Sequence, residues 1–152
     1  MVATKPHPAS DRDAFLDAAE LCELVPAEAI LESLVVREAP RFDTAVIERL
    51  RAASARLRCA AGDPAVAARA EHEFHRELVD RCRDERLRRS ALGVQRALLP
   101  YRLAAPVGAV HHEAIVDALA DGDHTAAAER IRAAFASTLA RLLAGVERRR
   151  GA

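Results

Sequence analysis

The residue types that could do chemistry in this chain are concentrated at three positions. Glu71 and His75 lie four residues apart in the segment AEHEFHRELV, and His112 follows in HHEAIVDALADGD. Side chains at positions i and i+4 share one face of a helix, so Glu71 and His75 can reach one ion without bending the backbone. His112 would complete the set from a second helix. The three residues therefore predict a metal or anion site.

The donor types indicate which ion such a site would hold. Two neutral imidazoles and one carboxylate leave two or three coordination positions open, as in catalytic zinc sites and in the facial triad of non-haem iron. We expect one divalent cation (Zn, Ni, Fe or Mn) that accepts an exchangeable anion or water. The alternative is that helix-surface charge and hydrogen-bonded histidines produce the same pattern without an ion.

Composition narrows the class of protein. The chain has 152 residues, enough for one domain, and its 23 basic residues balance 23 acidic ones. Apart from Arg148, Arg149 and Arg150 no basic cluster is present, which argues against direct nucleic-acid binding. Three cysteines without CxxC spacing predict reduced residues, and no apolar run has the length of a membrane span. We therefore expect a cytoplasmic protein without a membrane partner.

The first half of the chain shows helical spacing after an N-terminal arm. Residues 1–10 contain two prolines and no periodicity, and are expected to be flexible. A helix through 14–24 is expected next, followed by a second that carries Ile30 and Leu34 in its apolar pattern, and then by a third. The signals expected to bound these helices are Ser10 or Asp11, Pro26, Pro40, Asp43 and Gly62.

The second half predicts further helices that must carry the candidate ligands. Asp63 followed by Pro64 is a strong start signal, and Gly122 followed by Asp123 is a stop and a new cap. Pro100 is expected to end a helix and to open a connection that reaches Pro106. The four helices are expected over about 64–83, 84–99, 107–120 and 124–148. With no alternating segments, the chain predicts an all-α fold: an antiparallel bundle of about six to seven helices, in one domain over 11–150.

Two motifs in the second half resemble those of a known family. The first consists of Glu71, Phe74, His75, Leu78 and Leu87, and the second of His112, Ile115, Gly122 and Asp123. With these motifs in this order, the chain from about Asp13 to Val146 resembles the FCD domain. That domain is the effector-binding helical domain of FadR-type members of the GntR transcription regulators. The resemblance implies an FCD-like bundle, a small-molecule ligand and a homodimer.

The resemblance also implies a ligand set for the metal. In metal-binding members of the family, one Asp and three His hold a divalent cation beside the effector pocket. Glu71 falls on the Asp position, His75 on the first His and His112 on the second, whereas the third His position is Ala134 in this chain. No winged helix-turn-helix is expected ahead of the first helix, so any DNA contact would be made by a partner chain.

Four further residues are candidates for ligand binding. His111 is expected on the surface or at the rim of the pocket, where it can rotate in as a substitute metal ligand. The small side chain of Ala134 would add space. Arg96 and Arg102 would meet an anionic ligand, because guanidinium binds carboxylates in bidentate fashion. The alternative for both arginines is a solvated charged face.

Three functions remain compatible with these residues. The first is an effector domain that binds a small carboxylate, with or without a divalent cation at Glu71, His75 and His112. The second is a metal-dependent enzyme that reuses the pocket, with Glu71 or His111 as acid or base. The third is a metal-free interaction module.

Overall fold

The computed structural model describes residues 18–60, 62–104 and 111–150, and these residues form six helices and no strand. The fold is all-α, as predicted. The helices are α1 (Ala18–Glu38), α2 (Thr44–Cys59), α3 (Pro64–Val79), α4 (Glu85–Ala104), α5 (His112–Ala120) and α6 (His124–Arg150). None of these helices is both long enough and apolar enough to cross a membrane.

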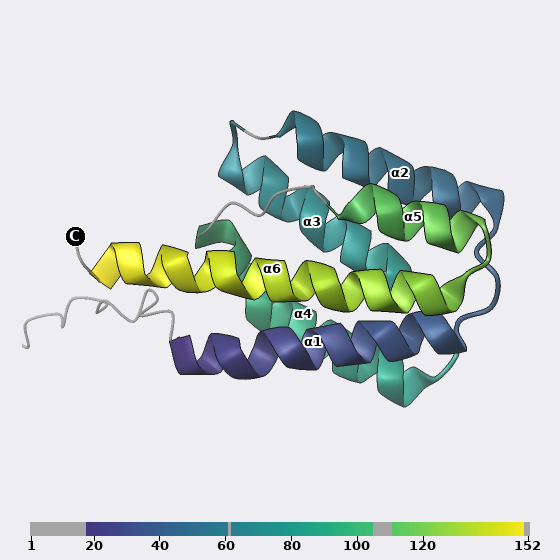
Figure 1. Cartoon of the computed structure of the whole chain (residues 1–152), viewed down its shortest axis with the longest axis horizontal. Helices are drawn as coiled ribbons and strands as arrows, with labels where there is room; N and C mark the ends of the chain where they lie inside the picture. Colours follow the sequence, from purple (N-terminus) through teal and green to yellow (C-terminus); the bar gives the residue numbers. More distant parts are fainter. Residues whose placement is uncertain (1–17, 61, 105–110, 151–152) are drawn as a thin grey trace, which may run out of the picture.

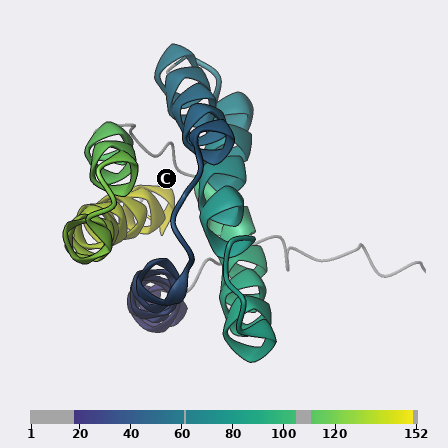
Figure 2. The same ribbon diagram turned by 90° about the vertical axis from the view of Figure 1, so that its right-hand side faces the viewer.

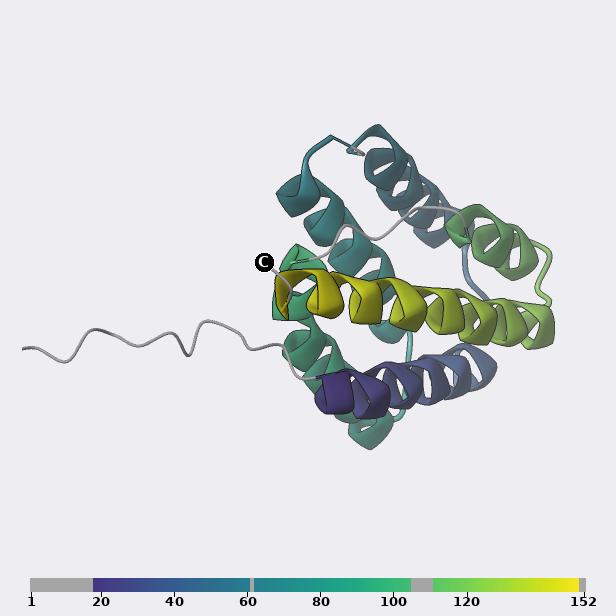
Figure 3. The same ribbon diagram turned by 60° about the vertical axis from the view of Figure 1, so that its left-hand side comes forward.

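The helices are arranged in two layers of three. Helices α5, α6 and α1 form one layer, and α2, α3 and α4 form the other (Figure 2). Neighbours within a layer run antiparallel, and α6 lies between α1 and α5 (Figures 1 and 3). The layers pack through contacts of α1 with α4 and α3, and of α2 with α5. A side chain on α3 can therefore meet side chains of α1, α5 and α6 in the space between the layers.

Capping residues set the starts of the helices, where the first backbone N–H groups lack partners within the helix. The side chain of Asp63 accepts hydrogen bonds from the backbone of Ala65 and Val66, and Pro64 occupies the first helical position. Asp43 caps α2 through the backbone N–H of Val46 at 2.9 Å. These starts agree with the sequence prediction, and they fix the register of the α3 face that carries the candidate ligands.

Two prolines that were expected to bound helices lie inside them. Pro26 is within α1 and Pro100 within α4, so the first two expected helices are one, and the expected connection after Pro100 is still helical up to Ala104. An interior proline removes a backbone hydrogen bond and costs about 3 kcal/mol. Both prolines face solvent, and both helices continue because burial of their opposite faces outweighs that cost.

Some expectations concern segments outside the described residues, and two residues of a predicted apolar pattern are exposed. The arm over 1–10, the start of the first helix and the segment 107–110 lie outside the described part of the chain. Ile30 and Leu34 follow the apolar pattern, yet they are 55% and 40% exposed, because α1 buries the opposite face against α6 and α4. The merged helix therefore leaves an apolar strip in solvent.

A largely apolar core fills the space between the layers. Its fully buried members include Leu21, Leu50, Phe74, Leu78, Ile115, Leu119 and Ile131. The acidic and basic side chains buried in this core, together with one amide, are Glu28, Glu32, Glu71, His75, Gln95, Arg102 and His112. Burying so many polar groups is costly unless each finds a partner, so this cluster is where a function is to be sought.

Candidate metal centre

The structure brings the three predicted ligands together between the layers. Glu71 and His75 lie on the inner face of α3, and His112 is the first residue of α5. The three side chains are 2%, 3% and 4% exposed, and one donor atom from each lies within 4.8 Å of the others. A surface-charge origin of the pattern is excluded, because all three groups are buried.

The carboxylate of Glu71 lies between the two imidazoles. Its Oε1 is 3.1 Å from Nε2 of His75, and its Oε2 is 3.1 Å from Nε2 of His112. Two donors held at about 2.0–2.1 Å from a tetrahedral ion are separated by about 3.3 Å, so these spacings suit a common cation. The contact between Oε2 and His112 lacks hydrogen-bond geometry and leaves that oxygen without a directed partner. The residues present therefore fit a divalent cation.

A second carboxylate holds the far side of the His75 ring. Nδ1–H of His75 donates to Oε2 of Glu32 on α1 at 2.7 Å, and Oε1 of Glu32 accepts from Nε2 of Gln95 on α4 at 2.8 Å. A histidine that donates one ring N–H to a carboxylate presents the other nitrogen in a fixed direction. The chain of contacts from Gln95 to Glu32 to His75 thus aims Nε2 of His75 at Glu71.

Opposing charges set the protonation of this cluster. Burial alone would lower the pKa of His75, but the carboxylates of Glu32 and Glu71 raise it to about 10. Burial would raise the pKa of Glu71, but its contacts with His112 and His75 hold it well below the ordinary value. The His75 imidazolium therefore provides, between two carboxylates, the positive charge that a cation would otherwise supply.

A narrow cavity opens beside the three ligands. It is lined by Glu71, His75, His111, His112, Ala134, Phe135, Thr138 and Arg141. Its volume of about 10 Å³ is room for about one water molecule. His111 and Ala134 thus lie next to the ligands, at the positions where the sequence suggested a rim residue and additional space. An organic ligand larger than one small group would have to displace side chains to enter.

The two candidate arginines do not line this cavity. Arg96 is exposed on α4, and its Nε donates to the carbonyl of Leu92. Arg102 is 1% exposed, and its Nη2 donates to Oε2 of Glu28 at 2.8 Å. A solvated face is therefore wrong for Arg102. Burial raises the pKa of Glu28 to about 7 although Arg102 opposes that shift.

Several residues of the site were missed by the sequence prediction. Glu32, Gln95, Thr138 and Arg141 come from α1, α4 and α6, and none of these four residues was predicted to approach His75. One signal was available for Glu32, since it is a single acid in the apolar run AILESLVV. A carboxylate flanked by apolar residues on a buried helix needs a partner inside the protein. Nothing in the sequence indicates that this partner is His75.

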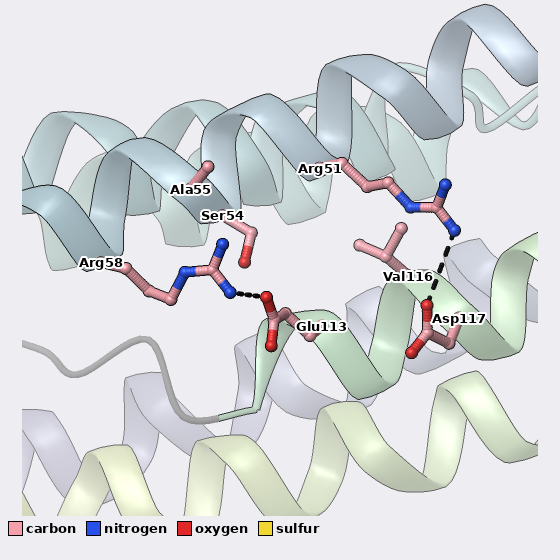
Figure 4. A pocket seen from close by; sticks show the side chains of 7 residues that line it. All are labelled: Arg51, Ser54, Ala55, Arg58, Glu113, Val116 and Asp117. Carbon is pink, nitrogen blue, oxygen red and sulfur yellow. Dashed lines mark ion pairs between the residues drawn. The ribbon is translucent and has the colours of Figure 1, made fainter.

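A larger groove lies elsewhere, between α2 and α5. Its volume is about 490 Å³, and it is lined by Arg51, Ser54, Ala55, Arg58, Glu113, Val116 and Asp117 (Figure 4). Arg51 pairs with Asp117 at 3.7 Å and Arg58 pairs with Glu113, so both ion pairs cross the groove. The two positive and two negative side chains balance and are more than half exposed, so the groove does not favour an anionic or a cationic ligand.

Comparisons with known proteins identify the family of the chain and agree with its all-α fold. No curated protein matches the chain, and no solved structure matches it. The family model of the FCD domain matches residues 23–137, a range that includes Glu71, His75, His112 and Ala134. This match covers most of the 152 residues. The chain belongs to the FCD domain family.

Proposed function

We propose that this FCD domain is the effector-binding domain of a GntR-type regulator, and that it binds a small carboxylate through one divalent cation held by Glu71, His75 and His112. The observation that carries the proposal is the buried set of one carboxylate and two imidazoles with donor atoms within 4.8 Å of one another. Three buried side chains that converge in this way need a positive charge between them or a network of protons.

The donor set favours a borderline cation. Imidazole suits zinc, nickel and iron, whereas a single carboxylate with two imidazoles offers too few oxygens for calcium or magnesium. Such a cation would bind a ligand's carboxylate oxygen or a water molecule at its open positions. Two carboxylates of the chain would support that cation. Glu71 would neutralise part of its charge, and Glu32 fixes the orientation of the His75 ring.

The dimensions of the cavity favour ligand binding over catalysis. An enzyme that uses Glu71 or His111 as acid or base needs room for a substrate beside these residues. The cavity holds about one water molecule, which matches a cation with one small coordinating group. His111 is the observation that supports the enzyme, because it lines the same cavity. Turnover of small carboxylates by the metal-loaded protein would favour the enzyme instead.

The proposal includes a homodimer and a cytoplasmic location, with no direct nucleic-acid contact. Exposed Ile30 and Leu34 lie one helical turn apart on α1 and support a second copy as partner, because a symmetric contact through this face would remove both apolar side chains from water. The balance of 23 basic and 23 acidic residues supports the lack of nucleic-acid contact. Sedimentation of the Ile30→Glu/Leu34→Glu double variant tests the dimer, and a mass unchanged from wild type at all concentrations would count against this face.

Metal titration of the whole 152-residue chain tests the central proposal. Calorimetry with Zn²⁺ and Ni²⁺ is expected to give one cation per chain, and His112→Ala is expected to weaken binding by about 100-fold or more. His124→Ala is the control, because His124 lies at the start of α6, outside the cavity. Circular dichroism of each variant verifies the fold. A His112→Ala protein that keeps its metal affinity and carboxylate binding would overturn the proposed site.

A further inference from the structure

Helix α6 lines the cavity with Ala134, Phe135, Thr138 and Arg141, of which the last two carry polar groups. Ala134, Thr138 and Arg141 line the cavity and follow one another at positions i, i+4 and i+7. Residues with this spacing lie along a single side of a helix. Ala134 offers no donor atom, so the polar groups of this face begin one turn later with the hydroxyl of Thr138 and continue with the guanidinium of Arg141.

Arg141 has hydrogen-bonding capacity that the protein does not use. Its side chain is half-buried, and its Nε is buried without a hydrogen-bond partner. No carboxylate forms an ion pair with Arg141 among the residues that the structure describes. A guanidinium donor withdrawn from water and left without an acceptor is unfavourable, and this cost is recovered when an anion binds.

The charges around the cavity favour a ligand of negative charge. A divalent cation at Glu71, His75 and His112 would share the cavity with Arg141, and Glu71 provides the one carboxylate in the lining of that cavity. Two positive groups that share one small, poorly solvated cavity repel each other, and an anion bound beside both relieves that repulsion. A carboxylate has the right shape, because its two oxygens can be shared between a metal ion and a guanidinium.

We propose that Arg141, assisted by Thr138, is the anion-recognition element of this cavity. One oxygen of a terminal carboxylate ligates the cation and the other accepts from Arg141. This inference rests on the proposed function and adds the residue that recognises the carboxylate, with the remainder of the ligand outside a cavity of about 10 Å³. Arg141 then determines the affinity for the anion, whereas Glu71, His75 and His112 determine the affinity for the cation.

Cobalt-loaded protein tests this division of roles. Co²⁺ is titrated into the full chain and then acetate is added, with both steps followed by the visible absorption of the metal. Arg141→Met is expected to raise the acetate Kd by about tenfold or more, with the Co²⁺ Kd within about threefold of wild type. Thr138→Val is expected to raise the acetate Kd by a smaller factor. Arg132→Met, an exposed arginine on the same helix, is the matched control and should change neither Kd.

The outcomes separate this inference from the proposal on which it rests. If wild-type protein binds no Co²⁺, the proposed function is overturned and this inference with it. If Co²⁺ binds but acetate does not, the carboxylate part of the proposed function is overturned with the inference, and the cation site remains. If Co²⁺ and acetate both bind and Arg141→Met binds acetate as wild type does, only the inference is overturned. Equal losses of Co²⁺ and acetate affinity in Arg141→Met would also overturn it, because they would indicate a structural role. Partial recovery of acetate binding in Arg141→Lys supports recognition by charge.

Discussion

Oε2 of Glu32 lies 2.7 Å from Nδ1 of His75, so a carboxylate on α1 fixes the ring of a residue on α3. Both side chains are buried, and the other oxygen of Glu32 is held by Gln95. The contact crosses the boundary between the two helical layers. The packing of the core therefore fixes the direction in which Nε2 of His75 points, whether or not an ion is bound.

The first prediction concerns this contact. Glu32→Gln keeps the shape and an acceptor oxygen but removes the charge, so we expect metal affinity to fall by about 10- to 100-fold. Competition with a chromophoric chelator measures the affinity. Nitrogen-15 spectra of the histidine ring are expected to show a changed protonation pattern at His75 in the metal-free protein. Glu23→Gln, on the exposed side of α1, is the control. Unchanged ring spectra in Glu32→Gln would exclude the orienting role.

The second prediction concerns proton release on metal binding. With a pKa of about 10, His75 is protonated at pH 7, and its Nε2 must lose that proton before it can bind a cation. We expect about one proton released per cation, and an apparent affinity that rises about tenfold per pH unit between pH 7 and 9. Calorimetry in buffers of different ionisation enthalpy measures the proton count. A count of zero at pH 7 would show that His75 is not a metal ligand.

The third prediction is the pH dependence of stability without metal. The folded pKa of His75 is raised above its ordinary value of 6.5, so the folded state binds this proton more tightly than the unfolded state. Its contribution is fully present below pH 6.5 and is lost as the pH rises through about 10. Urea denaturation is expected to give a falling free energy of unfolding over this window. His75→Gln should show a flatter profile, and a wild-type profile that rises with pH would contradict the assignment.

The fourth prediction concerns the buried pair formed by Arg102 and Glu28. Arg102→Met removes the only cation in contact with Glu28 among the described residues, and we expect a loss of about 3–5 kcal/mol in the free energy of unfolding. Arg102→Met/Glu28→Gln removes both charges and should recover much of that loss. Chemical denaturation measures both variants at pH 8, where Glu28 in the wild type is largely ionised. Equal stability of the single and double variants would show that the pair is not coupled.

The sequence was sufficient for the parts of the fold that local chemistry decides. Asp43 and the pair Asp63–Pro64 cap helices where expected, because a cap acts on backbone groups two or three residues away. The predicted helix boundaries at Pro26 and Pro100 were wrong because local chemistry does not decide them. Whether a helix continues past a proline depends on how much of its other face is buried, and that is decided by helices distant in the sequence.

The same distinction applies to the site. The spacing of Glu71 and His75 defines a shared helix face, whereas no local spacing predicts the approach of His112, which was expected from its residue type and from the resemblance to the FCD family. Glu32, Gln95 and Arg141 reach the cluster from three other helices. Their positions depend on how the two layers pack, and no local pattern in one sequence encodes that packing.

The groove between α2 and α5 is connected to the candidate metal centre through helix α5. α5, the nine-residue helix that begins with His112, is tied to α2 by Arg51–Asp117 and Arg58–Glu113, which are ion pairs between half-exposed groups. Such pairs contribute about 0–1 kcal/mol each, and dissolved salt screens them. We therefore expect ionic strength to act on the position of His112 through charges outside the proposed cation site, and the affinity of that site to depend on the salt content of its surroundings.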